Sequence, residues 1–99
     1  MTINKKQNGT TLEIALDDRL DNVTAPELDK EIKKGFDGVK TLIWDLRDLE
    51  YITSAGLRML LSCQKVMNRQ GDMIIRNVRP EIMEIFEITG FVDLLTVEE

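Results

Sequence analysis

The sequence predicts an α/β domain with a mixed sheet of four to five strands, an N-terminal antiparallel hairpin and three or more helices packed on the sheet. Residues 11–16 alternate apolar and polar side chains, which is typical of a half-buried strand. Residues 42–44 form a continuous apolar run, which is typical of a strand at the centre of a sheet. Segments with helical spacing separate the later strands, and this alternation favours parallel strands joined by right-handed crossovers.

The N-terminal third contains the hairpin and the first helix. Residues 2–7 form a weak strand, and Asn8-Gly9 is a dipeptide that favours a tight hairpin turn into residues 11–16. The helix is predicted to begin at Thr24, because Thr24 and Glu27 have the spacing of a capping box.

The middle third contains the core strand and the best-marked helix. The strand is predicted at residues 39–46, and residues 47–53 are interpreted as a polar loop. The second helix is expected to begin around Ser54, with apolar residues at a spacing of 3.6, and to stop at Gly71.

The C-terminal third repeats the alternation of strand and helix. A short buried strand is predicted within residues 72–78, and Pro80 opens a third helix that ends at Gly90. Residues 91–97 are apolar enough to dock on the domain, which suggests a last short strand.

Length and charge limit the functions that are open to the chain. Its 99 residues suffice for a single domain, residues 1–99. The formal net charge of −5 disfavours nucleic acid and anionic membrane surfaces as partners. No apolar run approaches the ~20 residues that span a bilayer, and the N-terminus lacks the apolar stretch of a secretory signal. We therefore expect a cytoplasmic protein with no nucleic-acid partner and no membrane insertion.

The residue types that support catalysis are scarce. The chain has no histidine and a single cysteine, so the usual ligands of soft metals are missing, and we expect neither metal nor cofactor. A catalytic serine would need a general base, which histidine cannot supply here. The sequence also lacks the glycine-rich phosphate loop of nucleotide-binding enzymes. No residue is therefore assigned as catalytic, and we expect a protein that is not an enzyme.

Two motifs carry a resemblance that spans nearly the whole chain. They are Arg19-Leu20-Asp21-Asn22-Val23-Thr24-Ala25-Pro26-Glu27-Leu28 and Leu49-Glu50-Tyr51-Ile52-Thr53-Ser54-Ala55-Gly56-Leu57. In sequence and spacing they resemble the STAS domain family, in particular the bacterial anti-sigma factor antagonists.

The resemblance implies a switch in transcription control. The unphosphorylated antagonist would bind an anti-sigma factor and release the sigma factor. That anti-sigma factor, a serine kinase of the histidine-kinase ATPase type, would phosphorylate Ser54, and a PP2C-type phosphatase would reset the pair. Many members carry aspartate where this chain has Thr53. Thr53 is therefore a second candidate acceptor, and a phosphorylation-independent scaffold, such as a STAS subunit of an ABC transporter, is the alternative function.

The residues assigned to partner binding come from both motifs. They are Asp21, Asn22, Thr24, Thr53, Ser54, Ala55, Gly56, Leu57 and Arg58. Several have simpler interpretations: Ser54 as a plain helix cap, Gly56 as a packing residue and Asp21 as a turn residue. A phosphate on Ser54 is expected to leave the fold intact and to add charge to a surface that Asp48 and Glu50 already make acidic.

Overall fold

The computed structural model describes residues 1–33 and 35–98, with only the backbone described for Lys33. Within that part the sheet has four strands in the order β1-β2-β3-β4. Their bounds are Ile3–Asn8 for β1, Thr11–Leu20 for β2, Thr41–Ile52 for β3 and Asp72–Arg76 for β4. β1 is antiparallel to β2, and β2, β3 and β4 are mutually parallel. The predicted mixed sheet with its N-terminal hairpin is confirmed.

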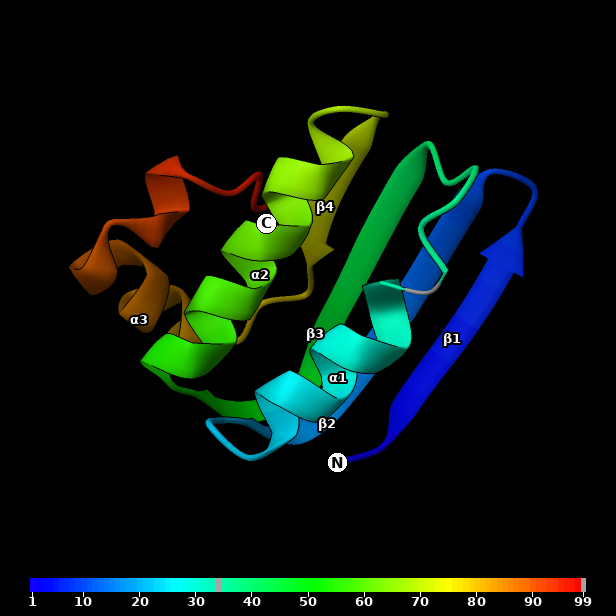
Figure 1. The fold of residues 1–99 in the computed structure, drawn as a ribbon. Helices are drawn as coiled ribbons and strands as arrows, with labels where there is room; N and C mark the ends of the chain where they lie inside the picture. Colours follow the sequence, from blue (N-terminus) through cyan, green and yellow to red (C-terminus); the bar gives the residue numbers. More distant parts are fainter. Residues whose placement is uncertain (34, 99) are drawn as a thin grey trace.

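Three helices pack on the sheet. Their bounds are Thr24–Lys33 for α1, Ser54–Met67 for α2 and Pro80–Thr89 for α3, and a short 3₁₀ helix, η1, follows at Phe91–Asp93. In Figure 1, α1 and α2 lie in front of the sheet, and α3 lies to the left of α2. α1 contacts β2 and α2, α2 contacts β3 and β4, and α3 contacts β3. α2 is thus the central helix, and its N-terminus lies beside the end of β3 from which it emerges (Figure 1).

The hydrophobic core lies between the sheet and these helices. In the regular parts of the parallel strands every second residue points into it, and these buried residues are Leu12, Ile14 and Leu16 of β2, Leu42, Trp44 and Leu46 of β3, and Met73 and Ile75 of β4. Ile43 points to the opposite face of β3 and is nevertheless only 8% exposed. The apolar run at residues 42–44 therefore does mark the strand at the centre of the sheet.

Two strands are longer than the sequence pattern predicts. β2 continues to Leu20, and β3 continues to Ile52 through the segment that was predicted as a polar loop. The pairing between β2 and β3 shifts register twice, between Ala15 and Asp17 and between Asp18 and Arg19. These irregularities break the alternation of apolar and polar residues. The loop prediction is therefore wrong for residues 47–52, and only Thr53 lies between the strand and α2.

The C-terminal segment docks on β4, as predicted. The backbone amide of Ile75 donates to the Thr96 carbonyl oxygen at 2.9 Å, and the Glu98 amide donates to the Ile75 oxygen at 2.8 Å. Ile75 and Val97 form a single parallel bridge, and Leu95 is buried. Among the residues described, none of the helices has the length and apolar character needed to cross a membrane.

Candidate functional site

The site is built around the first turn of α2, which the end of β2 holds in place. Thr53 is the N-cap residue, with an extended backbone at φ −102° and ψ 177°. Its carbonyl oxygen accepts the first helical hydrogen bond, from the Leu57 amide at 3.0 Å, and its own amide donates to the Leu20 oxygen at 3.0 Å. Ser54 is the first residue of the helix and is exposed. The expected start of the second helix at Ser54 is confirmed.

The two hydroxyl groups at this helix start have opposite environments. The Thr53 Oγ1 atom is buried, it makes no capping hydrogen bond, and no partner for it exists among the described residues. Ser54 instead lies at the surface. The first turn contains no acidic residue, so no carboxylate of that turn offsets its free amides and the positive end of the helix dipole. The start of α2 is therefore suited to a negatively charged group attached at Ser54.

Gly56 and Leu57 lie beneath this surface. A Cβ atom at position 56 would lie 2.7 Å from Ile52 Cγ1 and 2.8 Å from the Leu20 carbonyl oxygen, so only glycine fits without movement. Leu57 is 2% exposed. Of the two interpretations of Gly56, the structure supports close packing of the helix on the strand ends. Both residues position the site from below.

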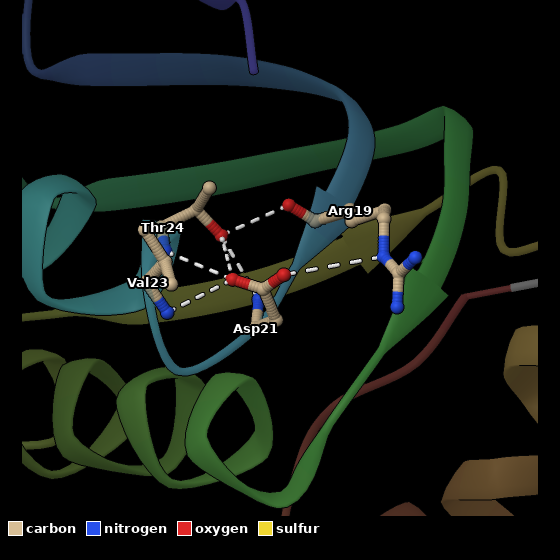
Figure 2. Close-up of polar contacts among 4 residues, drawn as sticks. All are labelled: Arg19, Asp21, Val23 and Thr24. Atoms are coloured by element: carbon tan, nitrogen blue, oxygen red, sulfur yellow. Dashed lines mark hydrogen bonds and ion pairs between the residues drawn. The ribbon is translucent and has the colours of Figure 1, made fainter.

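The motif that begins at Arg19 and ends at Leu28 forms the turn from β2 into α1, where Asp21 caps the helix (Figure 2). Asp21 Oδ1 accepts hydrogen bonds from the backbone amides of Val23, at 2.9 Å, and Thr24, at 3.0 Å. The Thr24 hydroxyl accepts in return from the Asp21 amide at 2.9 Å. The first helical hydrogen bond runs from the Ala25 amide to the Asp21 oxygen at 2.8 Å.

The predicted cap of this helix is therefore wrong. The reciprocal capping pair is Asp21 with Thr24, and not Thr24 with Glu27. Aspartate caps as well as threonine does, and both residue pairs have the same spacing, so the pattern alone did not separate them.

The charge of Asp21 is fixed by the same contacts. The backbone amides of Thr24 and then Val23 lower the pKa of its carboxyl group below the ordinary value of 3.8, and Arg19 adds a smaller attraction. The Arg19 Nε atom lies 3.9 Å from Asp21 Oδ2 (Figure 2). Asp21 is thus a turn residue, as its simpler interpretation held, and it is ionised at neutral pH.

The two motifs meet in space. The bond from Thr53 to Leu20 joins them through the backbone, and α1 contacts α2 beside it. A hollow of about 320 Å³ lies between the two helices, and its lining includes Ala25 and Pro26 of α1 and Ala55 and Arg58 of α2. Asn22, Ser54 and Arg58 are exposed around this junction, whereas Asp21, Thr24, Thr53 and Ala55 are half-buried.

Three further residues belong to this surface although no site role was assigned to them. The Arg19 guanidinium lies over the Tyr51 ring, 5.2 Å from its centroid. Tyr51 is 45% exposed and Val23 is 65% exposed, so both side chains present apolar surface to the solvent here. Tyr51 lies within the Ser54 motif, and that was the one sequence signal for it. The pairing with Arg19 depends on the irregular register of β2 and β3.

Acidic residues flank the site, as expected. Asp48 and Glu50 are exposed near the end of β3, four and two residues before its last residue. Asp48 pairs in register with Asp17 of β2. Within residues 1–33 and 35–98, no group of three histidine, cysteine or acidic side chains could hold a metal ion.

Comparison with known proteins gives consistent matches. The family model of the STAS domain matches residues 2–99. BtrV of Bordetella bronchiseptica, assigned as an anti-sigma factor antagonist, is 34% identical over 80 residues, which cover 79% of this chain and 69% of BtrV. The anti-sigma-B factor antagonist of Staphylococcus aureus is 32% identical over 89 residues, which cover 88% of this chain and 82% of that protein.

Solved structures of the same kind share the fold. The anti-sigma factor antagonist SpoIIAA in its unphosphorylated form has a TM-score of 0.78 with 19% identity, over 99% of this chain and 88% of that one. The phosphorylated form of SpoIIAA from Bacillus has a TM-score of 0.76 with 22% identity, over 99% of this chain and 92% of that one.

Proposed function

Because this chain belongs to the STAS domain family and is a homologue of anti-sigma factor antagonists, which are regulatory proteins and not enzymes, we propose that Ser54 switches its binding to an anti-sigma factor. Unmodified, the chain binds the anti-sigma factor in the cytoplasm and so frees a sigma factor. The anti-sigma factor is a serine kinase that phosphorylates Ser54, which ends the binding, and a PP2C-type phosphatase restores it.

One observation carries this proposal: Ser54 is exposed at a helix start whose N-cap residue, Thr53, makes no capping hydrogen bond with its side chain. A kinase must reach the hydroxyl oxygen, and it can reach Ser54 without opening the fold. The Thr53 oxygen is covered by the protein, which favours Ser54 as the acceptor and leaves Thr53 as a residue that supports the helix start.

The phosphate acts on the partner surface and not on the fold. It would carry about −1.5 to −2 charges, and the free amides and dipole at the start of α2 stabilise such a group. The fold is compatible with both states, since it resembles both forms of SpoIIAA. Asp48 and Glu50 lie close by in sequence, so the phosphate deepens an acidic surface and repels a partner that fits the unmodified one.

The direct contacts in this proposal are the exposed members of the predicted set. Asn22, Ser54 and Arg58 face the partner, and Ala55 borders the hollow between α1 and α2. Asp21, Thr24, Thr53, Gly56 and Leu57 hold these residues in position.

The experiment compares Ser54→Ala, Ser54→Asp and Thr53→Val for binding to the cognate anti-sigma factor and for phosphate uptake from ATP, measured by mass spectrometry. We expect Ser54→Ala to bind without being phosphorylated and Ser54→Asp to bind poorly. Thr53→Val is the matched control, and it should bind and be phosphorylated as the parent is. If Ser54→Asp binds as tightly as the parent, the switch is refuted and the phosphorylation-independent scaffold, such as a transporter subunit, is favoured.

A further inference from the structure

A hollow of about 540 Å³ lies next to the residues predicted to bind the partner, and none of those predicted residues lines it. It is lined by Asp18 and Arg19 of β2 and by Glu50 and Tyr51 of β3, and we call it the Arg19–Tyr51 hollow. Tyr51 lies three residues before Ser54, and Arg19 lies two residues before Asp21. Along the chain, the two strand segments that line the hollow therefore lead directly into the turn and the helix start that form the candidate site.

The hollow exists because β2 is irregular at this point. Asp18 has a left-handed backbone with φ 61°, a conformation that aspartate tolerates better than most residues. The pairing of β2 with β3 shifts between Asp18 and Arg19, which brings Arg19 opposite Tyr51. The carboxylates of Asp18 and Glu50 and the ring of Tyr51 consequently lie on neighbouring segments of β2 and β3.

The aromatic ring in the hollow is held before any partner arrives. The Arg19 guanidinium lies 5.2 Å from the centroid of the Tyr51 ring, and Arg19 Nε lies 3.9 Å from Asp21 Oδ2. The backbone amides at the start of α1 fix Asp21 in turn (Figure 2). A tyrosine that is 45% exposed and already ordered loses little conformational entropy on binding, which is typical of residues that anchor an interface.

The charges of the hollow define what it can bind. In the described part of the chain neither Asp18 nor Glu50 makes an ion pair, whereas Arg19 is already paired with Asp21. The hollow therefore offers two unpaired carboxylates beside an aromatic ring, and this combination favours a guanidinium or ammonium group. The net charge of −5 on the whole chain also favours a partner with a basic surface.

We propose that the Arg19–Tyr51 hollow receives a basic side chain, arginine or lysine, from the anti-sigma factor. The hollow determines which anti-sigma factor is bound, whereas Ser54 determines when it is bound. This inference rests on the proposed function, because its occupant is the same partner.

The test removes the two charges without changing the shape of the hollow. Asp18→Asn keeps a residue that tolerates the left-handed backbone, and Glu50→Gln is isosteric. We expect the double variant to bind the cognate anti-sigma factor about tenfold more weakly and with a shallower dependence of affinity on salt concentration. Tyr51→Ala should also weaken binding, with less change in its salt dependence. Glu84→Gln, at an exposed position of α3, is the control and should bind as the parent does.

Phosphorylation kinetics provide a second readout. For the double variant we expect the KM of the kinase for this chain to rise while kcat stays unchanged, because the hollow contributes binding and does not touch the reacting hydroxyl. Thermal unfolding of each variant checks that it is folded.

The outcomes separate the two proposals. If the double variant binds with the affinity and salt dependence of the parent while Ser54→Asp fails to bind, the hollow is not a recognition site and the switch at Ser54 stands. If Ser54→Asp binds as the parent does, the proposed switch fails. The hollow is then supported if the double variant still binds about tenfold more weakly, and overturned if it does not.

Discussion

At the residue scale, the hydroxyl groups of Thr24, Thr53 and Ser54 have different environments, although all three residues lie near the start of a helix. Thr24 makes hydrogen bonds with the Asp21 amide and with the Arg19 carbonyl oxygen, which its hydroxyl reaches at 2.9 Å. The Thr53 Oγ1 atom is buried without a partner among the described residues, and Ser54 is exposed. A polar group that is buried and unpaired costs free energy, whereas a paired one contributes about 1 kcal/mol. The three positions should therefore respond differently to loss of the hydroxyl.

A matched pair of valine substitutions tests this difference. Thr24→Val leaves the Asp21 amide without its acceptor, and we expect the free energy of unfolding to fall by about 1 to 2 kcal/mol. Thr53→Val replaces an unpaired hydroxyl by a methyl group, and we expect a rise of about 1 kcal/mol. Urea unfolding followed by the fluorescence of Trp44, the single tryptophan and fully buried, measures both. Equal destabilisation by the two variants would show that Thr53 is hydrogen-bonded.

The acid sensitivity of the domain is the second residue-scale prediction. The pKa of Asp21 is lowered by the backbone amides of Thr24 and Val23, and the pKa of Asp17 is lowered first by the Thr2 amide, 2.6 Å from Asp17 Oδ1. A pKa that is lower in the folded state adds stability above the ordinary value of 3.8, and this stability is lost as the pH falls through the lowered folded value.

The free energy of unfolding of the double variant Asp17→Asn/Asp21→Asn, measured from neutral pH down to about pH 2, tests this. Below about pH 4 it should depend less on pH than that of the parent. Asparagine at position 21 still caps the helix, and asparagine at position 17 can still accept from the Thr2 amide, so at neutral pH the variant should lose only the contribution of the two charges. Asp93→Asn, at an exposed position of η1, serves as control. Parallel pH profiles for the parent and the double variant would contradict this assignment.

At the scale of elements, the sequence pattern predicted the strands and helices whose positions depend on residues close together in the sequence. The alternation at residues 11–16, the helical spacing after Ser54 and the glycine after α3 are local signals, and the structure has the corresponding strand, helix and helix end. The extension of β3 to Ile52 was missed because Leu46, Leu49 and Ile52 are buried at a spacing of three, which a regular strand does not produce.

In the candidate site, too, the features set by local sequence could be predicted and the contacts between distant segments could not. Exposure of Ser54 follows from its position at the start of a helix, and the structure bears it out. The contact of Arg19 with Tyr51 joins two strands far apart in sequence and depends on a register shift, so no pattern within either motif could indicate it.

The packing of α2 on the strand ends gives a prediction at this scale. Gly56→Ala would place a Cβ 2.7 Å from Ile52 Cγ1 and 2.8 Å from the Leu20 oxygen, and we expect it to lower the free energy of unfolding by about 1 to 3 kcal/mol. Gly35→Ala is the matched control, because its Cβ would lie 3.6 Å from the nearest atom, the Ile32 oxygen. Chemical denaturation compares them, and a Gly56→Ala variant as stable as Gly35→Ala would mean that the helix is not packed this closely.

At the scale of the whole molecule, the sheet and its core support the site of the proposed switch and lie apart from Ser54. α1 and α2 lie on one face of the sheet, and Ser54 lies outside the core at the end of the sheet where β3 leads into α2 (Figure 1). In the proposed switch, a charge added there lies at the exposed start of a helix, where the helix dipole stabilises it, and faces the partner. The molecule can therefore change its binding while its fold stays the same.

The affinity of the cognate anti-sigma factor for this chain carrying phosphoserine at position 54, compared with the unmodified chain, tests that claim most directly. A switch from nearly complete to nearly absent binding needs a weakening of about 10⁴-fold, and the account predicts a loss of that order with an unchanged circular dichroism spectrum. Equal affinity of the two forms, or a phosphorylated form that has lost its folded spectrum, would contradict it.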